Sequence, residues 1–209
     1  MSAFRKLTAG LAGLAACAVA APATAADDTQ FDGTITLGAA ISLTGKYSTN
    51  GGHTKNGYDM AVDRINSMGG VEVGDKTYKL EVTYYDDEST PARGAQLAER
   101  LIQQDGVKFV LGPYSSGMTK AIAPVTEEYG VPMVEANGAS RSLFTQGYDY
   151  LFAVLSTSEQ YLASAVDLRA ELARKNGMKP ANMTIAGAFE NDPDRKSTRL
   201  NSSHVCSSR

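Results

Sequence analysis

Apolar strands and amphipathic helices alternate along most of this chain, and this order constrains its fold more than any other feature. Residues 34–41 form a continuous apolar run, as a strand buried on both faces requires, and a helical pattern follows over 53–68. A second strand is predicted over 76–85, after which Thr90 and Pro91 mark the start of another helix. This alternation indicates an α/β protein with a doubly wound parallel sheet.

The next connection between a strand and a helix is rich in groups that bind anions. An apolar strand over 107–111 ends at a Gly-Pro pair, and Ser115 and Ser116 follow where a helix over 117–129 is predicted to begin. Hydroxyls and unpaired N–H groups at a helix N-terminus favour a small carboxylate or phosphate. The turn is therefore a candidate binding site.

The following unit repeats this arrangement. A strand predicted over 131–135 leads into Gly138, Ala139 and Ser140, again just beyond a strand end. Because adjacent parallel crossover units present their loops on one rim of the sheet, we expect both clusters to share one carboxylate site. The alternative is that the serines only cap helices, which is the commonest role of serine at such positions.

The N-terminal segment has the pattern of a secretory signal peptide. Two basic residues precede an apolar stretch rich in Ala and Leu, and the small residues at 23–25 fit a cleavage site before Ala26. The uninterrupted apolar run is too short for a membrane-spanning helix, which needs about 20 residues. We therefore expect residues 1–25 to be removed on export. The alternative is a lipoprotein that begins at a lipidated Cys17.

The C-terminal residues 194–209 follow none of the preceding patterns. They lack apolar periodicity, and residues 194–204 match the reading-frame translation of a common sequencing adaptor at eleven consecutive codons. We therefore expect this segment to be a non-native tail that replaces the natural sequence near Pro193. A genuine polar tail would not explain the codon matches.

Composition excludes several kinds of site once both ends are set aside. Cys17 and Cys206 lie in the end segments, so the stretch 26–193 has no cysteine for a disulfide or a thiolate metal site. Its single histidine is His53. The net charge of the whole chain is −3, which gives no indication of nucleic acid as a partner. No metal or other cofactor is predicted.

The sequence also lacks the common catalytic motifs. The turn around Ser115 is not a nucleophile elbow, because Pro113 stands where that motif needs glycine, and neither a Walker loop nor a dinucleotide-binding fingerprint occurs. The acidic run 86–88 is interpreted as a solvated strand end, since a hard cation needs more oxygen ligands. We therefore expect a protein that binds a small molecule without catalysis.

Several separate motifs of this chain occur together, and in order, in one known family. They are Ser-Leu-Thr-Gly at 42–45, the helix and double glycine over 56–71, Tyr-Asp-Asp-Glu-Ser-Thr-Pro at 85–91, the turn at 112–117 and Phe-Glu-Asn-Asp at 189–192. With them, the chain resembles periplasmic solute-binding proteins of the leucine/isoleucine/valine-binding (type I) family, which serve ABC importers.

The resemblance implies two lobes that close on a small ligand. Residues 26–156 would form the N-terminal ligand-binding lobe, which ends after a short strand over 150–155. Residues 157–193 would begin a second lobe with a helix over 159–175 and a strand over 183–189, and the chain is expected to be truncated within that lobe.

The resemblance also implies roles for single residues. A serine of the Ser115-Ser116 turn and the hydroxyl of Ser140 would hold the α-carboxylate of the ligand, and the backbone carbonyl of Gly138 would meet its ammonium group. Ala139 lies in the same binding loop. Many relatives bridge two of these loops with a cysteine pair, and Ser89 and Tyr114 fall near those positions here. We expect Asn50, Tyr47 and Tyr114 to form a wall of the pocket.

The sequence thus predicts capture of a branched-chain amino acid, or of a related small amino acid or amide, for delivery to the membrane permease of an ABC importer. The full-length protein is expected to be a monomer. Two alternatives remain open at this stage. One is the ligand-binding sensory domain of a receptor, and the other is an α/β hydrolase or transferase whose remaining catalytic residues lie in the missing half.

Overall fold

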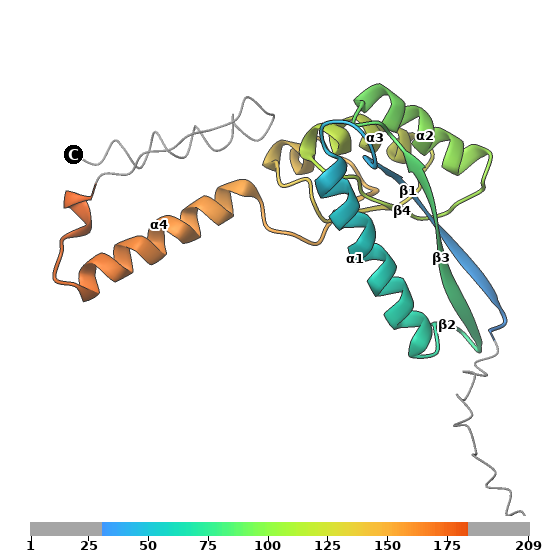
Figure 1. Cartoon of the computed structure of the whole chain (residues 1–209), viewed down its shortest axis with the longest axis horizontal. Helices are drawn as coiled ribbons and strands as arrows, with labels where there is room; N and C mark the ends of the chain where they lie inside the picture. Colours follow the sequence, from blue (N-terminus) through green and yellow to red (C-terminus); the bar gives the residue numbers. More distant parts are fainter. Residues whose placement is uncertain (1–30, 184–209) are drawn as a thin grey trace, which may run out of the picture.

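The computed structural model describes residues 31–183, in which helices and strands alternate (Figure 1). The strands are β1 Gly33–Ile41, β2 Val71–Val73, β3 Lys76–Asp86, β4 Val110–Leu111, β5 Met133–Glu135 and β6 Leu151–Ala153. The helices are α1 Ser48–Ser67, α2 Pro91–Gln103, α3 Ser116–Glu128 and α4 Ser158–Lys175, with short 3-10 helices η1 Arg141–Thr145 and η2 Pro180–Asn182. The predicted signal peptide, the tail and all but the first residue of the strand predicted over 183–189 lie outside the described residues.

The strands form one sheet in the order β2-β3-β1-β4-β5-β6. All neighbours pair in parallel except β2 and β3, so the predicted α/β class and doubly wound parallel sheet are confirmed. The chain first crosses from β1 to β3 and then returns past β1 to β4. This reversal between β1 and β4 is the topological switch point, outside which sheets of this kind bind their ligands.

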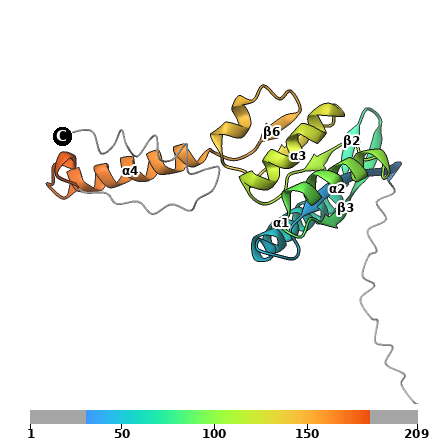
Figure 2. The ribbon, with the colours of Figure 1, turned by 90° about the horizontal axis from the view of Figure 1, so that it is seen from above.

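The reversal also decides which helix covers which face, because parallel crossovers are right-handed. α1 lies on one face of the sheet, and α2 packs beside α3 on the other (Figure 2). The main core lies between the sheet and the α2/α3 pair. Its buried members are Ala40, Leu97, Ala98, Leu101, Val107, Val110, Ile122, Ala123, Val131 and Met133.

The start of α1 differs from the prediction. The helix begins at Ser48 rather than at residue 53, because Gly51 and Gly52 belong to the helix and not to the loop before it. Gly51 is needed for close packing, since a Cβ atom there would lie 1.9 Å from the Ser42 carbonyl oxygen. The sequence analysis assigned both glycines to the loop before the helix, because glycine is common in loops. In the structure, Gly51 lets the helix lie directly against the end of β1.

The sheet also contains a strand that the sequence did not predict. β2 forms an antiparallel hairpin with β3 through a turn in which Gly74 has a φ of +67°. The turn itself was predicted, but three residues are too few for strand alternation to show. Conversely, β4, β5 and β6 are two or three residues long and shorter than the apolar runs that predicted them.

The second half of the sheet has one bare face. Leu111, Val134 and Phe152 are aligned across β4, β5 and β6 by the strand register, on the side that carries α1. α1 covers β1 and β3 rather than these strands, and Val134 and Phe152 are 37% and 51% exposed. After β6 the chain enters α4, which extends away from the sheet in both views (Figures 1 and 2). Within residues 31–183, no helix is both long enough and apolar enough to cross a membrane.

Candidate ligand-binding pocket

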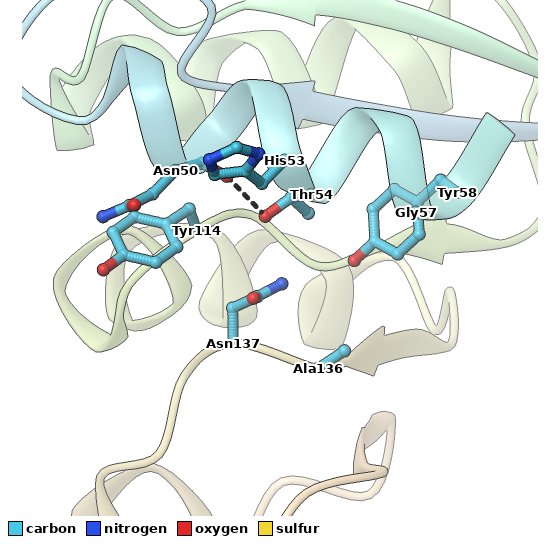
Figure 3. Close-up of a pocket in the computed structure, with 8 residues that line it drawn as sticks. All are labelled: Asn50, His53, Thr54, Gly57, Tyr58, Tyr114, Ala136 and Asn137. Carbon is cyan, nitrogen blue, oxygen red and sulfur yellow. Dashed lines mark hydrogen bonds between the residues drawn. The ribbon is translucent and has the colours of Figure 1, made fainter. Parts of the chain in front are cut away.

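A pocket of about 420 Å³ lies between α1 and the loops that follow β4 and β5 (Figure 3). It is lined by Asn50, His53, Thr54, Gly57, Tyr58, Tyr114, Ala136 and Asn137. Because these residues follow the carboxyl ends of parallel strands on both sides of the switch point, the pocket lies where sheets of this kind bind ligands. Asn50 and Tyr114 were predicted as pocket wall.

The helical wall is one face of α1. Asn50, His53, Thr54, Gly57 and Tyr58 are spaced so that they project from adjacent turns on one side. The Thr54 hydroxyl donates to the Asn50 carbonyl at 3.0 Å, which fixes that side chain against its own helix (Figure 3). Apart from Asn50, the sequence analysis missed this face, because it began the helix at His53, treated His53 as an ordinary surface residue and assigned Tyr58 to an apolar stripe. The periodicity would have revealed it once the helix was extended to Ser48.

Tyr58 ties the helical wall to the opposite loop. Its hydroxyl donates to the Gly112 carbonyl at 2.8 Å, at the point where β4 ends. Burial raises the pKa of Tyr58 well above its usual value, and an ionised Glu135 would add to this rise, so this hydroxyl keeps its proton at physiological pH. The pocket is therefore closed at this end by a fixed aromatic side chain.

The opposite wall comes from Tyr114, Ala136 and Asn137. The Asn137 side chain points across the pocket toward α1, and the Tyr114 ring lies at the other end of the opening from Tyr58 (Figure 3). Asn137 belongs to the second predicted cluster, but its amide was not singled out. The wall offers amide and imidazole groups between two aromatic rings, and none of its side chains is acidic.

The two serine clusters do come together, as the sequence predicted. Ser116 and Ser140 are both buried, and the Ser116 hydroxyl oxygen accepts a hydrogen bond from the Ser140 N–H at 3.1 Å. The Ser140 hydroxyl lies 2.9 Å from that of Ser142. The Ser116 hydroxyl thus joins the start of α3 to the loop after β5, and neither Ser116 nor Ser140 lines the pocket that the described lobe presents.

Ser115 has the capping role that the sequence left open as an alternative. It is the N-cap of α3, and its hydroxyl accepts from the Met118 N–H at 3.4 Å. Its φ of +83° is a backbone conformation that residues other than glycine rarely adopt, at a cost of about 1–3 kcal/mol. Strain of this kind persists only where surrounding contacts impose it, so the turn is held in shape by its neighbours.

Gly138 and Ala139 have structural partners as well. A Cβ atom at Gly138 would lie 2.7 Å from the Thr119 hydroxyl oxygen, so only glycine fits between this loop and α3. The Ala139 carbonyl accepts from both the N–H and the hydroxyl of Ser158, at 2.8 and 3.2 Å. The binding loop is thereby connected to the first residue of α4.

Tyr47 lies beside the pocket rather than in its wall. Its ring meets the Tyr114 ring edge to face, with the centroids 5.6 Å apart. The Tyr47 N–H donates to the hydroxyl of Ser89 at 3.0 Å, and that hydroxyl donates to the Thr44 carbonyl at 2.7 Å. Ser89 and Tyr114, for which the resemblance implied a cysteine pair in many relatives, are thus linked through Tyr47 by non-covalent contacts.

The interpretation of the acidic run 86–88 as a solvated strand end was wrong for Asp86 and Asp87, whereas Glu88 is exposed. Asp86 accepts from the Leu43, Thr44 and Glu88 N–H groups and from the Thr44 hydroxyl. Asp87 is fully buried and accepts from the Ser42 hydroxyl at 2.6 Å and the Ser89 N–H at 2.8 Å. These carboxyls hold the loops after β1 and β3 together. Within the part of the chain that the structure describes, no group of three histidine, cysteine or acidic side chains could hold a metal ion.

Comparison with known proteins gives the family. The sequence model of the periplasmic binding protein family matches residues 34–199. The Leu/Ile/Val-binding protein BraC3 of Rhizobium johnstonii is 34% identical over 126 residues, which are 60% of this chain and 33% of that protein.

Two solved structures share the fold. The branched-chain amino acid transporter substrate-binding protein of Streptococcus pneumoniae, in complex with isoleucine, has 29% identity and a TM-score of 0.54 over 64% of this chain and 39% of its own. An ABC transporter solute-binding protein of R. palustris, in complex with 4-hydroxybenzoate, has 30% identity and a TM-score of 0.56 over 69% of this chain and 36% of its own. The chain thus spans about a third of the length of the relatives that it matches. With a match over most of its length, the chain belongs to the periplasmic binding protein family, in its leucine/isoleucine/valine-binding (type I) branch.

Proposed function

We propose that this chain is the N-terminal lobe of an extracytoplasmic solute-binding protein that delivers a small organic acid to the permease of an ABC importer. The favoured ligand is a branched-chain amino acid or a related small amino acid or amide. In this proposal residues 1–25 direct export to the periplasm, residues 26–156 form the lobe, and a second lobe begins at residue 157 and completes the cleft. The bound solute is carried without chemical change.

The pocket between α1 and the loops after β4 and β5 is the observation that carries this proposal. It lies at the switch point of the sheet, it is open, and its wall combines Tyr58 and Tyr114 with the amide of Asn137. An open half-pocket with a fixed wall is what a lobe presents before a second lobe closes on the ligand.

The residues that we expect to hold the carboxylate are neighbours of pocket residues in the chain. Ser115, at the N-terminus of α3, is only half buried, and Gly138 and Ser140 belong to the loop that carries Asn137. We propose that closure brings the carboxylate of the ligand to this helix N-terminus, where N–H groups and a hydroxyl stabilise negative charge. Each lost charge-assisted hydrogen bond would then weaken binding by about 1.5–3 kcal/mol.

Binding measurements on the full-length natural protein test the proposal. Titration calorimetry with L-leucine, L-isoleucine and 4-hydroxybenzoate should show binding of at least one acid, whereas the amine formed by decarboxylation of leucine should not bind. Ser115→Ala and Ser140→Ala should weaken binding, and Ser67→Ala, at the far end of α1, serves as the control. Equal affinity for leucine and its amine, together with unchanged affinity in both serine variants, would exclude the carboxylate site. Hydrolysis of a ligand during titration would instead indicate an enzyme.

A further inference from the structure

Glu135 is a buried acidic residue at the centre of the loops that form the proposed solute site. It is the last residue of β5 and is 0% exposed. The chain packs tightly around it, since a Cβ atom at Gly112 would lie 2.3 Å from the Glu135 Oε2 atom. In the sequence, Glu135 is simply an acidic residue at the end of an apolar strand. No local pattern distinguishes it from an exposed side chain.

Each oxygen of this carboxyl group has a partner. Oε1 accepts from the N–H groups of Asn137 and Gly138, the latter at 2.5 Å. Oε2 lies 2.6 Å from the hydroxyl oxygen of Thr119 on α3. The carboxyl group therefore connects the loop after β5 to the first turns of α3.

The Thr119 hydroxyl has one proton but two neighbouring acceptors. Besides Glu135 Oε2, it lies 3.0 Å from the backbone carbonyl oxygen of Ser115, which cannot donate. If Glu135 is ionised, the hydroxyl can satisfy only one of these two oxygens. If Glu135 carries the proton on Oε2, it donates to Thr119, and Thr119 donates to Ser115. Each short contact then has one proton, while Oε1 still accepts both N–H groups.

The surroundings contain no charge that would favour the ionised form. Among residues 31–183, no lysine, arginine or histidine forms an ion pair with Glu135. The titratable side chain that faces it from α1 is Tyr58, which is neutral. The loop after β4 presents Gly112, which has no side chain, and α3 presents Thr119, whose hydroxyl does not titrate. Burial raises the pKa of Glu135, and the hydrogen bonds from Thr119 and the backbone N–H groups offset this only in part.

We infer that Glu135 is a neutral carboxylic acid that positions the solute site through a relay from Glu135 to the Thr119 hydroxyl and on to the Ser115 carbonyl. The relay joins the loop that carries Asn137 to the strained N-cap of α3. It supplies contacts that hold Ser115 at its positive φ. Its functional consequence rests on the proposed solute binding, whereas the protonation state of Glu135 does not.

The protonation state is measured first, without any ligand. The chain is labelled with carbon-13 at the glutamate side-chain carboxyls, and their NMR shifts are followed with pH. One resonance should keep the shift of a protonated acid up to neutral pH. It should be missing from Glu135→Gln and present in Glu127→Gln, whose carboxylate also accepts backbone N–H groups, from Asp149 and Tyr150. If the resonance that is lost in Glu135→Gln titrates near the ordinary glutamate value of about 4.3, the inference is wrong.

Variants of the full-length protein then test the positioning role with L-leucine and 4-hydroxybenzoate as probes. Glu135→Gln should keep the wild-type affinity, since an amide can donate to Thr119 and accept both N–H groups, whereas Glu135→Leu should lose at least tenfold. Thr119→Val should also weaken binding, and Thr119→Ser should restore it. Equal losses in Glu135→Gln and Glu135→Leu would show that the charged form is required. If neither probe binds the wild type, the proposed ligands fail, but the NMR result still decides the state of Glu135.

Discussion

The two halves of the sheet are built in different ways. β1 and β3 pair over nine residues, with α1 on one face and α2 on the other. β4, β5 and β6 contribute two or three residues each, α3 covers one face, and Val134 and Phe152 are exposed on the other. Regular backbone pairing therefore holds the first half. The second half depends on side-chain hydrogen bonds between α3 and the segment from the end of β5 onward, such as those of Ser116 with Ser140 and of Thr119 with Glu135.

This difference explains where the pocket lies. A loop that is fixed by side-chain hydrogen bonds can present a groove beyond the strand ends, whereas a continued strand would fill that space. α1, which belongs to the regular half, supplies a rigid wall, and the loops after β4 and β5 supply the other. The boundary between the two halves is thus also the boundary across which a solute would lie.

The largest expected effect is the loss of a core side chain that packs between α2 and the sheet. Leu101 on α2 is fully buried, and its side chain also packs against Gly38 of β1. Leu101→Ala should lower the free energy of unfolding by about 2–5 kcal/mol, because it leaves a cavity in a close-packed region. Urea denaturation measures this. A loss below about 1 kcal/mol would mean that the regular half does not carry the stability assigned to it.

A second test separates two neighbouring glycines in α1. Gly51→Ala should destabilise the lobe by about 1–3 kcal/mol, because its methyl group would overlap the Ser42 carbonyl. Gly52→Ala is the matched control, since a methyl group there meets nothing within 4 Å, and it should stabilise the helix by about 0.5–1 kcal/mol. Thermal melts of both variants measure the difference. Equal effects would show that α1 does not lie against β1 as closely as described.

The same glycines show which features of the fold could be predicted from the sequence and which could not. Thr90 and Pro91 predicted the start of α2 correctly, and Ser115 and Ser116 marked the start of α3 to within one residue, because caps are local signals. Gly51 has no local signal for its packing partner, Ser42, so α1 was begun too late and the pocket face was missed. From its charge alone, Asp87 was expected to be exposed. It is buried instead, because of contacts with residues that are distant in sequence.

Asp86 and Asp87 give a third test, since these adjacent carboxyls behave in opposite ways. Burial would raise the pKa of Asp86, but its hydrogen bonds from Thr44, Glu88 and Leu43 together lower it. Burial raises the pKa of Asp87 despite its bonds from Ser42 and Ser89, and the charge of Asp86 adds to the rise. Each pKa difference makes stability depend on pH, with opposite sign.

The expected outcomes follow from these signs. The stabilisation from Asp86 is present above the unfolded value of about 3.9 and is lost as pH falls through its lowered folded pKa, so Asp86→Asn should cost about 1–2 kcal/mol at pH 7 and little in acid. The contribution of Asp87 is present below about 3.9 and is lost as pH rises through its raised folded pKa, so Asp87→Asn should gain relative to the wild type toward neutral pH. Denaturation of both variants across pH 3–8 measures the free energy of unfolding at each pH. If the two variants change in the same way with pH, the two carboxyls do not have opposite environments.

The smallest expected effect lies on the bare face of the second half. Leu151 and Phe152 are neighbours on β6 whose side chains point to opposite faces, Leu151 toward the main core and Phe152 toward the uncovered side. Leu151→Ala should cost about 1–2 kcal/mol, whereas Phe152→Ala should change the free energy of unfolding by no more than about 0.5 kcal/mol, because little of its contact area is lost. The Phe152 variant should also associate less in sedimentation measurements, since an exposed apolar row promotes contact between molecules. A stability loss at Phe152 equal to that at Leu151 would mean that both faces of this half are packed, and the contrast between the two halves would then disappear.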